Sequence, residues 1–322
     1  VDMLQRHPEI EQQEIEAPIF ILGMPRTGTT STHELMALDP QFRVPLSWEV
    51  AYPFPPPETA SYTSDPRIGK VEAELARVDQ LLPGFKNMHP MGAQLPQECV
   101  GLFCHEFRSM QFDVEFRVPA YQQWLESQDM RDLYRSHRRW LQLLQWHCPG
   151  QPWVLKTPQH LWQLDSLLAE YPDARIVMLH RDPLKVTVSI SSLISHLRGL
   201  ASNRNNPGEI ARDYAASMQR ALAAATAARQ RADLPPERII DIHFPEFIAD
   251  PVAAVGKIYN HFNLERGGEA KSAMRAFIAA GRETDRHGRH SYRFEDTGLD
   301  ADEERRRFAT YQKHYGVRDE PL

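Results

Sequence analysis

A glycine loop with the sequence GMPRTGTTS spans residues 23–31, between an apolar run and a helix-forming run. Gly23 and Gly28 have the spacing of the two glycines in GxxxxGK[ST] loops, where backbone N–H groups and a helix N-terminus hold phosphate oxygens. Thr29 stands where such loops have the lysine that reaches the β- and γ-phosphates of a triphosphate. The loop therefore predicts a phosphate site that does not require a triphosphate. A tight strand-to-helix turn without a ligand is the alternative.

Side chains of the same loop supply a cation and hydroxyl groups. Arg26 can clamp one anionic group, and Gly28 lets the backbone approach that group. Thr29 and Thr30 add hydroxyl donors at the start of the helix. We therefore expect one phosphate-like group at this point.

A second candidate anion site lies in MLHRDPLKVTVSISSL, residues 178–193. Asp182 and Pro183 are typical of a helix start, so Arg181 should lie at the carboxyl edge of the preceding strand. Ser189 follows about two helical turns later. Together Arg181 and Ser189 can hold a second phosphate, although each taken singly also fits a surface ion pair or a solvated serine.

Short apolar runs and helical patterns alternate along the chain, which is typical of a parallel sheet with helices on both faces. The predicted strands are Ile19–Leu22, Trp153–Leu155, Arg175–Leu179 and Ile239–His243. The predicted helices that follow or separate them include His160–Tyr171, Pro183–Gly199, Glu209–Ala232 and Val252–Phe262.

In this order the motifs resemble those of the sulfotransferases that use 3′-phosphoadenosine 5′-phosphosulfate (PAPS), in particular the bacterial branch with a G-x-P-R-[ST]-G-T-T loop. The resemblance covers the chain from about Pro18 onward. It implies that Arg181 and Ser189 hold the 3′-phosphate of the nucleotide. It also implies that the first loop holds the 5′-phosphosulfate, through Pro25, Arg26, Thr27, Gly28, Thr29 and Thr30.

The resemblance also implies an architecture: an α/β fold with a P-loop-like parallel sheet flanked by helices and a largely helical insertion. We expect residues 18–322 to form a single domain, in which about residues 45–150 make the helical insertion and acceptor region. Residues 1–17 are expected to be an N-terminal tail or the remnant of an upstream segment.

The segment VLKTPQHLWQLDSLLAEYPDARIV resembles the K-[ST]-P-x-H element of the bacterial branch, which places Lys156 beside the transferring sulfuryl group. Arg26 and Lys156 are thus the predicted charge stabilisers. His160, four residues after Lys156, is the first candidate for the general base, with Glu98 and His33 as further candidates. A capping or core histidine is the alternative reading of His160.

Near the end of the chain, RHGRHSYRFEDTGL resembles an element that closes over the nucleotide, so Arg286, His290 and Tyr292 are predicted nucleotide contacts. The sequence departs from the animal branch at Ser31, where that branch has a tryptophan, and at Pro158, where it has a histidine. The contacts to the adenine base are therefore left open.

The predicted reaction moves a sulfuryl group from PAPS to a hydroxyl or amine by in-line displacement, releases adenosine 3′,5′-bisphosphate (PAP) and needs no metal ion. One alternative is a P-loop kinase or NTPase, which would need the missing lysine and an acidic Mg²⁺ ligand. Another is a relative that binds the nucleotide without turnover.

Composition limits the partners. The chain has 322 residues, a formal net charge of −6 and a pI near 6.2, which argue against nucleic acid as a partner. It has three cysteines without a disulfide or metal pattern, and no apolar run approaches the ~18 residues of a transmembrane segment. We expect a cytoplasmic protein that acts on a small-molecule, lipid or sugar acceptor, and homodimerisation is left open.

Overall fold

Four parallel strands form one sheet in the order β2–β1–β3–β4. The computed structural model describes residues 2–150, 152–203, 205–232, 234–283 and 293–322. The strands are β1 (Ile19–Gly23), β2 (Val154–Lys156), β3 (Arg175–His180) and β4 (Ile239–His243). Each bound lies within one residue of its prediction, and the expected parallel sheet is confirmed.

The central strand β1 is apolar along its whole length and is buried on both faces of the sheet. Phe20 and Leu22 point to one hydrophobic cluster, and Ile19 and Ile21 point to the other. Strands that are covered on both sides read as continuous apolar runs without a polar alternation. This explains why the strands were readable from local sequence.

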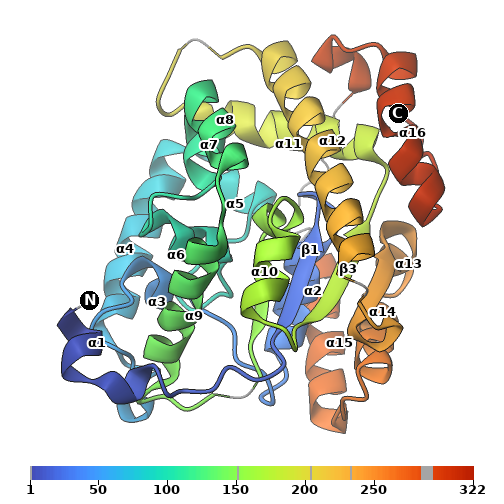
Figure 1. Cartoon of the computed structure of the whole chain (residues 1–322). Coiled ribbons are helices and arrows are strands. Elements are labelled where there is room, and N and C mark those ends of the chain that lie inside the picture. Colours follow the sequence, from blue (N-terminus) through green and yellow to red (C-terminus); the bar gives the residue numbers. More distant parts are fainter. Residues whose placement is uncertain (1, 151, 204, 233, 284–292) are drawn as a thin grey trace.

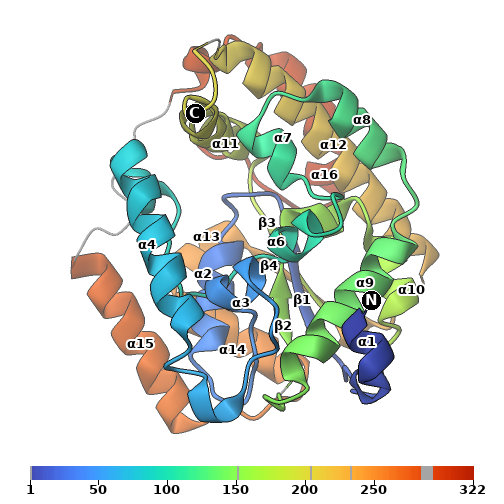
Figure 2. The same cartoon turned by 90° about the vertical axis from the view of Figure 1, so that its left-hand side faces the viewer.

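Helices cover the two faces in two layers (Figure 1, Figure 2). One layer contains α2 (Thr29–Ala37), α13 (Phe244–Ala249), α14 (Pro251–His261) and α15 (Gly268–Glu283). The other contains α9 (Arg131–Gln145), α10 (Leu164–Glu170), α11 (Pro183–Arg198), α12 (Pro207–Arg231) and α16 (Ala301–Tyr315).

The segment between α2 and β2 is largely helical, as expected. Before α9 it contains α3 (Ser47–Ala51), α4 (Pro66–Leu81), α5 (Phe85–Met88), α6 (Cys99–Cys104), α7 (Gln111–Glu115) and α8 (Pro119–Ser127). The N-terminal residues begin with α1 (Asp2–Arg6) and pack on α9, where Arg139 Nε lies 2.8 Å from Glu11 Oε1.

The predicted helix His160–Tyr171 is wrong in its first part. Pro158–Leu161 form a 3-10 turn, which the Thr157 side chain caps by accepting a hydrogen bond from the Gln159 N–H. The α-helix begins only at Leu164. Proline at the first position and the threonine cap define a short turn of their own, so the apolar spacing that continues past them does not make one helix.

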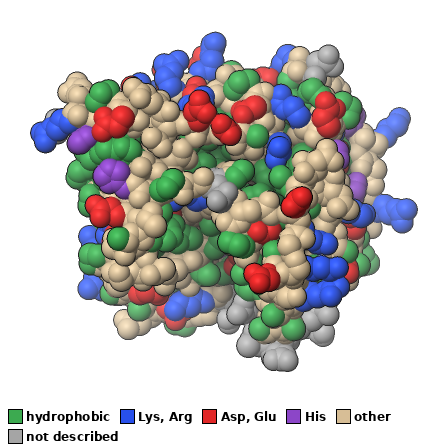
Figure 3. Space-filling view, turned by 90° about the horizontal axis from the view of Figure 1, so that it is seen from below, with side chains coloured by type: hydrophobic (Ala, Val, Ile, Leu, Met, Phe, Trp, Pro, Cys, Tyr) green, Lys and Arg blue, Asp and Glu red, His purple; other side chains and the backbone are tan. Residues whose placement is uncertain are grey.

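Charges of both signs are spread over the face of the molecule seen in Figure 3, with hydrophobic side chains between them. This matches the balanced composition of 37 basic and 43 acidic residues. Among the described helices, none is both long and apolar enough to cross a membrane.

Candidate functional site

The carboxyl edge of the sheet carries the candidate residues. Loop residues 24–28 follow β1, Lys156 ends β2, and Arg181 follows β3 directly. β1 lies between β2 and β3. The strands that follow β1 in the sequence therefore lie on both sides of it, and the strand order reverses direction there. Parallel α/β sheets bind their ligands at such a switch point, outside the carboxyl ends of the strands.

The N-terminus of α2 has no side-chain cap. Its N-cap residue is Gly28, with a φ of 94°. A Cβ at Gly28 would lie 3.1 Å from the Phe247 ring, so both the backbone conformation and the close approach require glycine. Helix N–H groups left without a cap bind anions well. The N-terminus of α2 can therefore receive a phosphate.

The loop before α2 is held by its own threonine. Thr27 is fully buried, and its hydroxyl donates to the Met24 carbonyl at 2.7 Å. Pro25 and Arg26 form the turn, with Arg26 at a φ of 68°, a strained conformation for a residue with a side chain. The hydroxyl of Thr27, one of the predicted nucleotide contacts, thus supports the loop itself.

Arg26 joins the loop to the helices around it. Its Nε donates to Ser189 Oγ at 3.1 Å, and its Nη1 donates to the Met88 carbonyl at the end of α5 at 2.8 Å. Its own carbonyl accepts from Arg181 Nη1 at 2.9 Å. The structure therefore brings Arg26, Arg181 and Ser189 together, as their predicted roles on one nucleotide require.

Lys156 and Glu98 form a close ion pair at the end of β2. Lys156 Nζ lies 2.5 Å from Glu98 Oε1 and donates to Thr30 Oγ1 at 3.2 Å. The Lys156 side chain is only 3% exposed, whereas that of Glu98 is 17% exposed. The pair is thus largely desolvated, which strengthens its electrostatic interactions.

Glu98 is held in its ionised form. Burial alone would raise the pKa of its carboxyl, but the neighbouring Lys156 ammonium outweighs that effect, and the pKa is lowered below its usual value. Burial also lowers the pKa of the half-buried His89 imidazole to about 4, even though the Glu98 carboxylate raises it. At neutral pH the site therefore holds a carboxylate beside a neutral imidazole.

His160 does not share this environment, which speaks against its predicted role as the base. It is fully buried, its Nδ1 lies 2.7 Å from the Tyr134 hydroxyl, and its ring meets Phe20 edge-on at 5.1 Å. Burial lowers its pKa well below the usual value. Phe20 faces the cluster on the opposite side of the sheet from α2, whereas Lys156 reaches Thr30 of α2. His160 is thus a core histidine in this structure.

His33 is also enclosed. It is 1% exposed, and its Nε2 lies 3.0 Å from the Val154 carbonyl. Burial, followed by the charge of Lys156, lowers its pKa to about 3. Of the three candidate bases, Glu98 is the one whose side chain both contacts Lys156 and keeps some exposure.

Arg181 presents one edge of its guanidinium to an anion. Its plane lies over the Phe244 ring, 3.8 Å from the ring centre, and its Nη1 is taken by the Arg26 carbonyl. The remaining edge faces the Glu320 carboxylate, with Nε at 3.0 Å from Oε1 and Nη2 at 3.1 Å from Oε2. This is the fork geometry with which arginine binds carboxylates and phosphates.

Arg286, His290 and Tyr292 fall outside the described residues. Conversely, sequence reasoning missed His89 and Glu320, because neither belongs to a recognisable motif and each reaches the site only through the course of the chain.

A pocket between α7, α8 and α12 has a lining of mixed polarity. Its apolar lining residues are Met110, Leu125, Trp162, Tyr214 and Met218, and its polar ones are Asp113, Gln122, Glu126, Gln163, Ser217 and Gln159, which belongs to the turn that follows Lys156. Beside it, Phe107 and Trp124 are 65% and 40% exposed. Of the insertion's other aromatic residues, Trp48 and Phe103 belong to the core.

Comparisons with known proteins agree with this geometry. The model of a family described as the sulfotransferase family matches residues 18–269. The solved structure of sulfotransferase STF1 from Mycobacterium tuberculosis H37Rv is 33% identical and has a TM-score of 0.83, over 96% of this chain and 80% of that one. Sulfotransferase STF9 from Mycobacterium avium is 29% identical, with a TM-score of 0.87 over 100% and 82% of the two chains. These likenesses confirm the expected P-loop-like α/β fold.

A curated relative is more distant. The omega-hydroxy-beta-dihydromenaquinone-9 sulfotransferase Stf3 of Mycobacterium bovis is 25% identical over 263 residues, which are 77% of this chain and 63% of that protein. The chain therefore spans less than two thirds of the length of this relative.

Proposed function

Because the chain belongs to the sulfotransferase family, we propose that it moves a sulfuryl group from PAPS to an acceptor hydroxyl or amine and releases PAP. The observation that carries the proposal is the joining of Arg26, Arg181 and Ser189 at the carboxyl edge, beside the uncapped N-terminus of α2. This arrangement offers two neighbouring anion sites, which suit the two phosphate groups of one bisphosphate nucleotide.

The two ends of the nucleotide use different groups in this proposal. The N–H groups of α2 and the loop hold the 5′-phosphosulfate, since a glycine cap leaves them available. Arg181 and Ser189 hold the 3′-phosphate. The Glu320 carboxylate on Arg181 supports this assignment, because it shows that the guanidinium edge accepts a two-oxygen anion in this setting.

Lys156 and Glu98 divide the chemistry between them. The acceptor oxygen or nitrogen forms a bond to sulfur, while the bond between sulfur and the bridging oxygen breaks and PAP leaves. Lys156 and Arg26 stabilise charge on the oxygens of the transferring and leaving groups, without a metal ion. Glu98 takes the acceptor's proton. When the Lys156 ammonium turns toward the sulfuryl group, Glu98 loses part of its stabilising partner and becomes a stronger base.

A lipid-like alcohol is the acceptor class we propose. The apolar side chains in the pocket between α7, α8 and α12 support this class, and Gln159 connects the pocket to the strand end that carries Lys156. The name of the relative Stf3, which refers to a hydroxylated dihydromenaquinone, points the same way. The cytoplasmic location, the homodimer and the division at residue 17 stay predictions.

Calorimetric titration with PAP tests the nucleotide site. We expect PAP to bind, and we expect Arg181→Ala to weaken PAP binding about 10- to 100-fold while leaving adenosine 5′-monophosphate unchanged. Arg220→Ala, which removes an exposed arginine paired with Glu126, is the matched control and should change neither affinity. If ATP with Mg²⁺ binds as tightly as PAP, or if Arg181→Ala has no effect, the proposal fails.

A further inference from the structure

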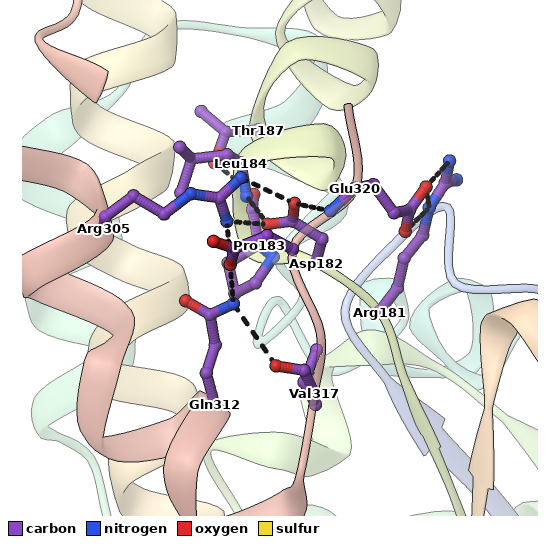
Figure 4. A network of polar contacts seen from close by, with 10 residues as sticks. Arg181, Asp182, Pro183, Leu184, Thr187, Arg305, Gln312, Val317 and Glu320 are labelled. Carbon is purple, nitrogen blue, oxygen red and sulfur yellow. Dashed lines mark hydrogen bonds and ion pairs between the residues drawn. The ribbon is translucent and has the colours of Figure 1, made fainter. Parts of the chain in front are cut away.

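The segment after α16 runs back over the carboxyl edge of the sheet and brings Glu320 to Arg181 (Figure 4). The two residues are 139 positions apart, and three donor–acceptor distances of 3.0, 3.3 and 3.1 Å join the guanidinium to the carboxylate. The Arg181 and Glu320 side chains are 19% and 21% exposed, so the pair is only partly screened by water.

Contacts other than the Glu320 carboxylate fix the course of this segment. The Glu320 N–H donates to Asp182 Oδ2 at 2.7 Å, and Asp319 accepts from Arg305 at 2.9 Å and from Gln312 at 2.8 Å. Upstream, the Tyr311 hydroxyl of α16 lies 2.9 Å from His180 Nδ1. The backbone is therefore anchored beside Arg181 whether or not the carboxylate is bound there.

Among the described residues, Glu320 is the side chain that binds the Nε–Nη2 edge of the Arg181 guanidinium. Nη1 is directed to the Arg26 carbonyl and the plane is covered by Phe244. Nε and Nη2 form an edge that can make two parallel bonds to a phosphate, and both face Glu320. A carboxylate and a phosphate cannot occupy this edge together.

We propose that Glu320 is an internal competitor of the nucleotide: its carboxylate occupies the place of the 3′-phosphate in the free protein and leaves when PAPS or PAP binds. This inference rests on the proposed function. A phosphate monoester carries more negative charge than a carboxylate, so it displaces Glu320 from Arg181. In most molecules of the free protein, Glu320 occupies Arg181. Only the fraction of molecules in which Arg181 is free can bind a 3′-phosphate, so the apparent affinity is lower in proportion to that fraction.

The same contact assists turnover. After transfer, the returning carboxylate replaces the 3′-phosphate of PAP, so Arg181 is not left unpaired when the product departs. The contact therefore disfavours tight retention of the product, and it acts only on nucleotides that carry a 3′-phosphate.

Glu320→Gln tests the proposal because it removes the charge and keeps the backbone bond to Asp182. The expected result is a PAP affinity about 3- to 10-fold tighter by calorimetry, with slower PAP release in stopped-flow measurements. The affinity for adenosine 3′-monophosphate should rise in parallel, whereas that for adenosine 5′-monophosphate should not change. Asp319→Asn is the matched control, since Asp319 is the neighbouring carboxylate and pairs with Arg305.

The outcomes separate the two proposals. If the original chain binds PAP through Arg181 but Glu320→Gln leaves PAP affinity unchanged or lowers it, Glu320 is a structural tether and the competition is refuted. The same conclusion follows if Asp319→Asn tightens PAP binding as much as Glu320→Gln does. If PAP does not bind, or binds independently of Arg181, the proposed function itself is overturned.

Discussion

Two helices, α2 and α11, begin shortly after neighbouring strands of the sheet. The N-terminus of α11 has a side-chain cap, whereas that of α2 has none. α2 begins after Gly28, which has no side chain to cap the helix. α11 begins after Asp182, which is 1% exposed and accepts from the Leu184 N–H at 3.0 Å. Asp182 also binds both outer nitrogens of Arg305, at 2.6 and 2.9 Å.

The difference shows how one strand-to-helix connection serves two purposes. At α2 the helix N-terminus is left for an anion, and the nearby cations Arg26 and Lys156 reinforce that preference. At α11 the carboxylate of Asp182 already caps the helix N-terminus and offsets its partial positive charge. The group that can bind an anion there is the side chain of the preceding residue, Arg181. Asp182 in turn anchors α16 and the segment that carries Glu320.

The largest effect is expected at Lys156, the cation beside the uncapped helix. Lys156→Met should lower the rate of sulfuryl transfer about 10²- to 10³-fold, because charge on the transferring group then lacks its nearest ammonium. The measurement is single-turnover transfer from PAPS to an alcohol acceptor found by screening. An unchanged rate would remove Lys156 from the mechanism.

A double variant controls for stability in that experiment. Lys156→Met alone leaves the Glu98 carboxylate buried without its partner, so urea unfolding should show a loss of about 3 kcal/mol. Lys156→Met with Glu98→Gln should regain much of that loss, which would assign the loss to the unpaired carboxylate.

An intermediate effect is expected from giving α2 the cap that α11 has. Gly28→Asp places a carboxylate where the 5′-phosphosulfate should lie and should weaken PAP binding about 30- to 100-fold. Gly28→Ala is the matched control, since it introduces the same contact with Phe247 and the same φ strain without a charge. Equal PAP affinities for the two variants would mean that no phosphate binds at this helix.

The smallest effect is expected at the capped helix. Asp182→Asn keeps an acceptor for the Leu184 N–H but removes the charge that binds Arg305, so the free energy of unfolding should fall by about 1–2 kcal/mol. Asp300→Asn, at the N-cap of α16, should cost only a few tenths of a kcal/mol because no arginine contact to Asp300 is described. Urea denaturation measures the free energy of unfolding of both variants. Equal losses of stability would mean that Asp182 does not anchor α16.

Much of the fold could be predicted because its signals are local. The strands are largely apolar runs, and Asp182–Pro183 and the glycine loop mark where helices begin. The helix predicted over His160–Tyr171 was wrong because periodicity alone does not show that Thr157 and Pro158 close a separate turn. The roles of the predicted site residues themselves stay predictions.

The sequence by itself determined the family, the order of the elements and the residue types at the strand ends, because these depend on motifs and on short-range spacing. Only the tertiary structure decided which side of the sheet each side chain faces. It enclosed His160 in the core, paired Glu98 with Lys156 and brought Glu320 to Arg181. Contacts between residues tens to more than a hundred positions apart depend on how the layers pack, and no local pattern in the sequence specifies them.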